Sequence, residues 1–163
     1  NDWPDVSDEA LLGTLGEWLG TPLLGAKSLT DVAKVNVEAA LTAAFVPWSK
    51  RSEWDRLAPS HVVVPTGSNI PVDYADPAKP VLAVRLQEVF GLIDTPRVLG
   101  GTLPLTMHLL SPAHRPAAVT QDLRSFWAGP YFDVRKDLRG RYPKHVWPDD
   151  PLAAAPTRRA KPR

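Results

Sequence analysis

The sequence predicts an α+β fold, in which short N-terminal helices are followed by a small, mostly antiparallel sheet with packed helices. Up to Leu57 the apolar residues recur at helical spacing between turn residues. From Pro59 onward, β-branched runs alternate with turns rich in glycine and proline. The chain therefore divides into a helical segment of residues 1–58, an α+β domain of residues 59–151, and a basic tail of residues 152–163 that we expect to be mobile.

The helical segment carries capping signals at the start of three of its predicted helices. Ser7 is of the residue type that caps helices, and Asp8 and Glu9 follow it in the first turn, where the helix dipole favours acids. A first helix is therefore predicted over residues 7–19. Ser28 and Asn36 give the same kind of signal for two further short helices, over residues 28–35 and 36–46, and the spacing of apolar residues predicts another over residues 49–57.

A change of pattern after residue 59 predicts a β-hairpin. The β-branched run 61–64 is followed by a Pro-Thr-Gly-Ser turn at 65–68 and by a second strand at 70–74. Pro71 lacks an N–H group, which indicates an edge position for that second strand. Residues 81–90 are predicted to be helical, because their apolar side chains recur at helical spacing.

The second half of the domain is predicted to hold two more strands and two helices. Residues 96–99 and 102–110 form the strands, and the Gly-Gly pair between them is a hairpin turn signal. Thr120 is predicted to cap the next helix. Pro130 suits the first turn of the last helix, which we expect to end at Gly140.

The stretch from Arg139 to Pro151 closes the last predicted helix and opens the basic tail. Gly140 suits the left-handed conformation of a helix end, and the prolines that follow exclude further helix. Tyr142 and Trp147 are large rings with polar tips, and we expect them to pin this segment to the domain. Two interpretations stay open, namely a strap that packs its rings onto the core and a surface that binds nucleic acid.

The net charge of +1 hides an asymmetry between the two ends of the chain. Residues 1–123 carry 9 basic and 14 acidic side chains, whereas residues 124–163 carry 10 basic and 4 acidic ones. A basic end on a nearly neutral protein indicates an affinity for phosphate, although solvated tails share this pattern.

The composition also excludes several kinds of site and protein class. Cysteine is absent, which excludes disulfides and cysteine-ligated zinc and fits a cytoplasmic location. No apolar run approaches the roughly 20 residues of a membrane span, and no secretory signal is visible. Because the chain begins at Asn1 rather than Met, we expect it to be part of a longer protein.

Catalytic and metal-binding motifs are missing from the sequence. It contains no phosphate loop, no dinucleotide-binding glycine motif and no zinc-protease motif. The four histidines lack ligand-like spacing, and Asp149 with Asp150 lies in a proline-bounded turn. Ser111 is near His114, but no nucleophile elbow surrounds it. We therefore predict no catalytic residue, no metal site and no cofactor in this chain.

Several long motifs resemble the C-terminal region of bacterial HrpB, a family of ATP-dependent RNA helicases of the DEAH-box group. The similar runs are 84–91, 104–105, 108–113, 115–116, 120–123, 126–127 and 140–151, with 65–68 and 156–161 fitting the same family. The resemblance covers nearly the whole chain from about Leu57 onward. Runs punctuated by proline, tryptophan and tyrosine at this length rarely recur by chance.

The resemblance implies a parent protein with two RecA-like domains that bind and hydrolyse ATP, followed by accessory domains. No residue of this chain matches the phosphate loop or the DEAH box of that family. ATP and magnesium are thus expected in the parent and not in this chain. The partners that the resemblance implies are RNA and the upstream helicase domains of the same polypeptide.

Two functions from different classes follow. The first is a nucleic-acid-binding accessory domain, whose basic side chains contact phosphates and whose rings, Tyr74 included, stack on bases. Asp133 and Asp137 would neutralise part of the basic surface. The residues proposed for binding are Arg135, Lys136, Arg139, Arg141, Tyr142, Lys144, Trp147, Arg158, Arg159 and Lys161. The second is a protein-interaction or structural module, which predicts that the rings of Tyr142 and Trp147 are buried.

Overall fold

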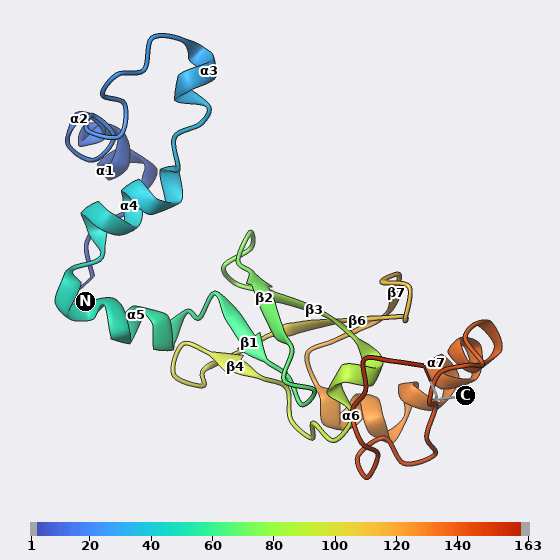
Figure 1. The fold of residues 1–163 in the computed structure, drawn as a ribbon. Coiled ribbons are helices and arrows are strands. Elements are labelled where there is room, and N and C mark those ends of the chain that lie inside the picture. Colours follow the sequence, from blue (N-terminus) through green and yellow to red (C-terminus); the bar gives the residue numbers. More distant parts are fainter. Residues whose placement is uncertain (1–2, 161–163) are drawn as a thin grey trace. The chain divides into compact units, whose positions relative to one another are not determined.

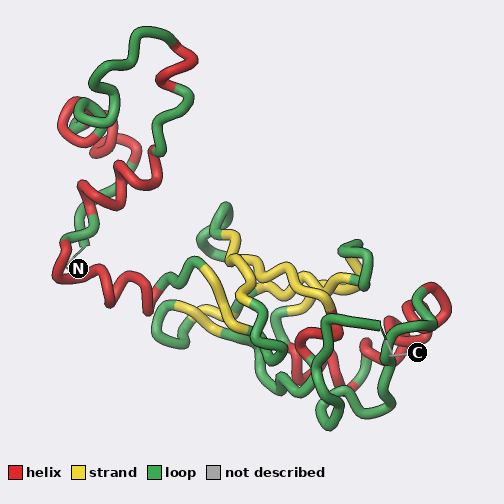
Figure 2. The backbone as a smooth tube through the Cα atoms, in the orientation of Figure 1, coloured by secondary structure: helices red, strands yellow, loops and turns green. Residues whose placement is uncertain are grey.

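The structure, a computed structural model, describes residues 3–160 and divides the chain into two compact units. Unit 1 comprises Asn1–Asp55 and unit 2 comprises Arg56–Arg163, so the division lies close to the change of pattern at residue 59. Figure 1 shows the helices of unit 1 in blue and cyan, and Figure 2 separates its helices from the strands of unit 2 by colour. No helix in the described range is long and apolar enough to cross a membrane.

Unit 1 is built from short helices, and those that begin after Ser7, Ser28 and Asn36 have capped first turns, as the sequence predicts. The side chains of Ser7, Ser28 and Asn36 each accept a hydrogen bond from a backbone N–H three residues later. The predicted first helix is broken at Thr14, between two glycines that disfavour helix. The helices are α1 (Asp8–Gly13), α2 (Leu15–Trp18), α3 (Leu29–Val32), α4 (Val37–Phe45), η1 (Trp48–Lys50) and α5 (Arg51–Leu57), the last of which crosses into unit 2.

Unit 2 is organised around a five-stranded sheet of order β1-β2-β3-β6-β7. The strands are β1 (His61–Val63), β2 (Asn69–Asp73), β3 (Val81–Arg85), β6 (Thr106–Leu110) and β7 (Pro116–Thr120). All neighbours are antiparallel except β3 and β6, which confirms the mostly antiparallel sheet. A separate two-stranded sheet pairs β4 (Arg97–Val98) with β5 (Leu103–Pro104).

The helix predicted over residues 81–90 is wrong. Val81–Arg85 forms the central strand β3, and only Leu86–Val89 coils, as the 3-10 helix η2. Both edges of β3 are paired, to β2 and to β6, and all four side chains of η2 are buried. A short, fully buried apolar run does not distinguish a strand from a helix by its spacing, which explains the error.

Three further local predictions are corrected by the structure. Pro71 does not lie on an edge strand, because β2 is enclosed by β1 and β3. The pairing of β2 with β3 begins only at Val72. Pro71 therefore lies outside that ladder, and its missing N–H costs the ladder no hydrogen bond. Gly140 does not end the last helix, which continues to Arg141. Finally, Asp122 rather than Thr120 caps the helix that follows β7.

The helices α6 (Leu123–Ala128) and α7 (Pro130–Arg141) bring an aromatic cluster into the core of unit 2. The rings of Phe90, Phe126, Trp127 and Tyr131 lie with centroids 5.1–6.3 Å apart, mostly edge to face. The Tyr131 hydroxyl donates to the Pro148 carbonyl at 2.8 Å. Burial of this ring raises the pKa of Tyr131 to about 12, so the hydroxyl stays a donor.

Residues 142–160 form an extended segment, the C-terminal strap, which Figure 1 shows in red beside α7. Backbone hydrogen bonds attach it to η2 and to the chain just beyond η2: Thr157 N–H donates to the Gln87 carbonyl at 2.9 Å, and Gly91 N–H donates to the Pro151 carbonyl at 3.0 Å. The described part of the expected mobile tail, residues 152–160, belongs to this strap. Lys161 lies outside the described residues.

Candidate nucleic-acid interface

The last helix, α7, presents the basic residues that the sequence places near the C-terminal end. Lys136, Arg139, Arg141 and Lys144 are exposed to solvent at and just beyond the end of this helix. No side chain in the described range pairs with Lys136, Arg139 or Lys144. Arg141 forms an exposed ion pair with Asp137 at 3.1 Å, as the spacing of the acids leads us to expect. We call these four residues the α7 basic ridge.

Arg135, which the sequence groups with these basic residues, lies in a different environment. Its side chain is 17% exposed and pairs with Asp149 of the C-terminal strap. Its Nε also donates to the Trp147 carbonyl at 3.3 Å. Arg135 therefore fastens the strap to α7, and its guanidinium is already engaged by a carboxylate.

The two rings that the sequence assigns either to the core or to bases lie against the core. Trp147 is 8% exposed and its Nε1 donates to the Tyr142 carbonyl at 2.8 Å. Tyr142 is half-buried against the same cluster, with its hydroxyl 3.4 Å from Ser111 Oγ. Tyr74 is likewise half-buried and donates to the Pro59 carbonyl. This burial is what the structural interpretation of the strap predicts.

Arg158 and Arg159 lie on the strap where it passes the turn between β1 and β2. Both residues are exposed, and Arg158 Nη2 donates to the Thr66 carbonyl at 2.6 Å. Together with Thr66 and Thr157 they line an open, polar hollow. The sequence predicted that these arginines bind phosphate, but it contained no signal that the strap would carry them to this turn.

A buried carboxylate beneath that turn escaped the sequence analysis. The Glu88 side chain is 5% exposed, and Arg85 Nε and Nη2 donate to its Oε1 at 2.8 and 2.7 Å. The hydroxyls of Thr66 and Ser68 donate to its other oxygen. Burial raises the pKa of Glu88, but the hydrogen bonds from Ser68, Arg85 and Thr66 together lower it below the ordinary value. This carboxylate therefore stays charged and joins the turn to η2.

A histidine of the strap completes this polar layer. His145 Nδ1 lies 3.2 Å from Gln87 Nε2, and Gln87 itself is buried. Burial, and next the positive charge of Arg85, lower the pKa of His145 below its ordinary value. His145 is therefore neutral at physiological pH and can accept the amide hydrogen bond. Among the described residues no group of three or more histidine, cysteine or acidic side chains could hold a metal ion.

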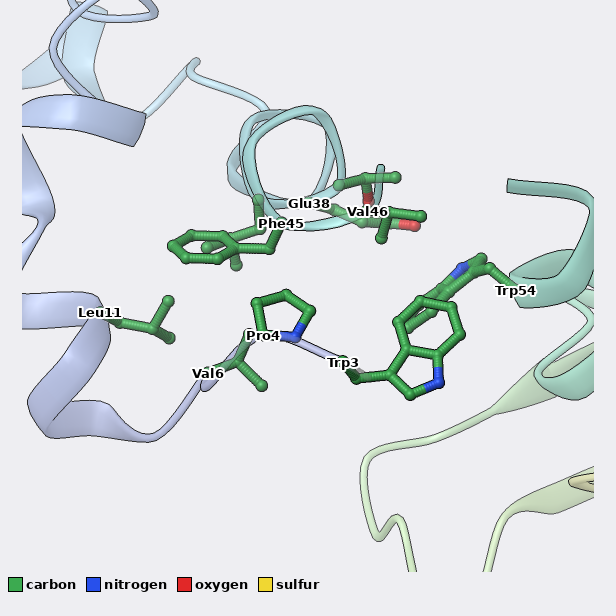
Figure 3. A pocket seen from close by; sticks show the side chains of 10 residues that line it. Trp3, Pro4, Val6, Leu11, Glu38, Phe45, Val46 and Trp54 are labelled. Carbon is green, nitrogen blue, oxygen red and sulfur yellow. The ribbon is translucent and has the colours of Figure 1, made fainter. Parts of the chain in front are cut away.

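Unit 1 contains an apolar cavity of about 320 Å³ that the sequence did not indicate. Figure 3 shows Trp3 and Trp54 at one end of it and Phe45 towards the other. The ring centroids of Trp3 and Trp54 lie 5.8 Å apart. Nearby, Trp48 is 85% exposed and Arg51 lies over its ring, 5.4 Å from the centroid. Apolar surface of this extent is typical of contacts with another protein segment.

Comparison with known proteins gives consistent matches along the chain. A family model described as HrpB_C, ATP-dependent helicase C-terminal, matches residues 18–151. The chain is 46% identical over 160 residues to the ATP-dependent RNA helicase HrpB of Escherichia coli (strain K12), which covers 98% of this chain and 20% of that protein.

Two solved structures match as well. A crystal structure of the E. coli DExH-box NTPase HrpB has a TM-score of 0.85 at 46% identity, covering 98% of this chain and 20% of that one. A crystal structure of the Escherichia coli DEAH/RHA helicase HrpB has a TM-score of 0.69 at 41% identity, covering 90% and 18%. The chain thus spans about a fifth of the length of the relatives that it matches.

Proposed function

Because the chain belongs to the HrpB family of ATP-dependent helicases, of which it is the C-terminal domain, we propose that it is a non-catalytic accessory domain that helps to bind or position RNA. The observation that carries this proposal is the α7 basic ridge. Three of its four side chains have no acidic partner among the described residues, so their charge is available to phosphates.

The environment of the rings narrows the mode of binding. Trp147 is buried in the core and leaves no open face for a stacked base, whereas Tyr142 is half-buried against the same cluster. Contacts from lysine and arginine to phosphate position a strand without reading its sequence. The proposed domain therefore binds RNA with little sequence preference, and the strong salt dependence of phosphate contacts is its main signature.

A protein-interaction or structural module is the second candidate function. The apolar cavity and the exposed ring of Trp48 in unit 1 favour it, because both would be covered by another protein segment. The partner in that case is the upstream part of the helicase polypeptide. A cytoplasmic location fits both functions and stays a prediction.

Removing charge from the ridge tests the RNA proposal. We expect the variant with Lys136→Ala, Arg139→Ala and Lys144→Ala to bind single-stranded RNA more weakly than the parent chain at low salt. Its slope of log affinity against log salt should be shallower by about 0.7 for each lost phosphate contact. Affinity is measured by fluorescence anisotropy across a salt series, with folding checked by circular dichroism.

The matched control removes three exposed basic side chains elsewhere, through Lys27→Ala, Lys79→Ala and Arg115→Ala. This control separates a local contact from the general effect of net charge. If the folded ridge variant and the control show the same affinity and the same salt slope, the ridge does not contact RNA. The protein-interaction or structural function is then favoured over RNA binding.

The isolated chain should not hydrolyse ATP, with or without RNA. The phosphate loop and the acidic magnesium-binding motif of the family are both missing from its sequence. In the proposed arrangement, ATP and magnesium bind to the upstream domains. Steady-state release of phosphate is the measurement, and turnover above the buffer blank that persists through further purification contradicts the non-catalytic assignment.

A further inference from the structure

The turn at residues 65–68 and the end of the C-terminal strap enclose an open hollow of about 460 Å³. Its walls are polar, and no carboxylate of the described residues lines it. The lining residues are Pro65, Thr66, Pro156, Thr157, Arg158 and Arg159. Two arginines and two threonines around one concavity supply donors of the kind that hold a phosphate group.

Arg158 is held in place at the wall of this hollow. The hydrogen bond from its Nη2 to the Thr66 carbonyl is 2.6 Å long, and Nη2 lies 3.6 Å from where a side chain on Gly67 would begin. Gly67 has a φ of +78°, a conformation that glycine adopts without strain and that shapes the turn under the guanidinium. Within the part of the chain that the structure describes, only Nη2 of the fork forms a hydrogen bond, so the other donors can bind an anion.

The backbone of Arg159 is also held in place by hydrogen bonds. The Thr157 hydroxyl accepts from Arg159 N–H at 3.1 Å and lies 3.2 Å from the Arg159 carbonyl. Thr157 N–H in turn donates to the Gln87 carbonyl. Two prolines, Pro65 and Pro156, stiffen the two walls. The site is therefore largely formed before a ligand arrives, which lowers the entropic cost of binding.

The buried carboxylate of Glu88, which accepts a hydrogen bond from the lining residue Thr66, does not oppose an anion in this hollow. Glu88 binds Thr66 and Ser68 from below, and Arg85 neutralises it with two hydrogen bonds. Among the described residues that line the hollow, no carboxylate compensates the charges of Arg158 and Arg159. This separates them from Arg135 and Arg141, each of which faces a carboxylate.

We propose that this hollow binds a phosphate group, supplied by the backbone of a single RNA strand. The proposal rests on the RNA-binding function above and adds a second contact point on the C-terminal strap, separate from the α7 basic ridge. An open hollow admits a continuous strand that enters and leaves, whereas small molecules are usually enclosed on most sides. Free inorganic phosphate offers the same chemistry and is the alternative source.

The test follows the two arginines directly in the intact chain. Nitrogen-15 NMR reports the Nε–H signals of Arg158 and Arg159 and the backbone N–H of Thr66 during titration with an oligouridylate of about 12 nucleotides. Parallel titrations use inorganic phosphate. We expect the oligouridylate to shift these signals at micromolar concentration and inorganic phosphate to shift the same signals only at millimolar concentration.

Variants measure the effect on affinity. Arg158→Ala with Arg159→Ala should weaken oligouridylate binding about tenfold at low salt, since hydrogen bonds to charged groups are worth this much or more. The salt slope should fall by about 0.7 per lost contact. Arg159→Ala alone removes no contact within the described residues and tests the site without disturbing the strap. Lys79→Ala with Arg115→Ala, which removes the same charge elsewhere, should bind normally.

The outcomes separate this proposal from the function on which it rests. Oligouridylate binding that depends on the α7 basic ridge but is unchanged in both arginine variants overturns the hollow and leaves the RNA function standing. Signals that shift with inorganic phosphate but not with bound RNA overturn the RNA source. Absence of RNA binding in the parent chain refutes the RNA function, and with it the RNA source of the phosphate, whatever inorganic phosphate does to the same signals.

Discussion

Replacing Glu88 with alanine is expected to lower the free energy of unfolding of unit 2 by about 3–5 kcal/mol, the usual cost of removing one partner from a buried ion pair. Arg85, whose side chain is 22% exposed, would keep its charge without the carboxylate that now accepts two of its hydrogen bonds. The hydroxyls of Thr66 and Ser68 would lose their shared acceptor. The turn at 65–68 would then lose its attachment to η2.

Urea denaturation followed by tryptophan fluorescence measures this change. The matched control is Asp94→Ala, which removes an acid that is 73% exposed and pairs with Arg124 at 2.9 Å. Exposed pairs contribute about 0–1 kcal/mol, so the control should denature almost like the parent chain. Equal midpoints for Glu88→Ala and Asp94→Ala would show that the buried carboxylate does not hold this region together.

The pH dependence of stability gives the same carboxylate a second signature. Its folded pKa lies below the ordinary value of 4.5, because hydrogen bonds from Ser68, Arg85 and Thr66 outweigh the effect of burial. The unfolded chain therefore binds the proton more readily. This contribution to stability is complete above pH 4.5 and is lost as the pH falls through the folded pKa. The stability difference between the parent chain and Glu88→Gln should accordingly shrink on acidification.

Features that depend on neighbouring residues could be predicted from the sequence. The side chains of Ser7, Ser28 and Asn36 cap helices because a cap needs only a donor three residues away. The hairpin of β1 and β2 likewise follows from its turn residues. Pairing between distant strands leaves no such local trace, which is why β3 was predicted as a helix and β7 was missed.

The same distinction holds for the candidate site. The concentration of positive charge from residue 124 onward is visible in the sequence. The sequence does not show which of these basic side chains pair with acidic residues. Arg135 pairs with Asp149, and Glu88 accepts a hydrogen bond from Thr66. Both contacts form because the fold brings together residues that are far apart in the chain. Apolar periodicity also gave no warning that Trp48 would be exposed while Trp147 is buried.

Trp147→Ala is expected to lower the free energy of unfolding by about 2–4 kcal/mol, since it removes a buried ring and leaves a cavity. The ring is 8% exposed within the core cluster, and its Nε1 donates to the Tyr142 carbonyl at 2.8 Å. Two neighbouring contacts depend on the same segment, those of Arg135 with the Trp147 carbonyl and of Tyr131 with Pro148. The loss should therefore loosen the strap as well as the core.

Trp48→Ala and Trp147→Phe complete this experiment. Trp48 is 85% exposed, so its removal should change stability by only about 0.5 kcal/mol or less. Trp147→Phe keeps an aromatic ring but loses the Nε1 donor. Its free energy of unfolding should lie between those of the parent chain and Trp147→Ala. RNA affinity should be unchanged in the folded Trp147→Phe protein, because the ring lies inside the core and not on a base. Unaltered urea denaturation of Trp147→Ala, together with weaker RNA binding by Trp147→Phe, would instead make this ring a ligand contact and would contradict the packing of the strap.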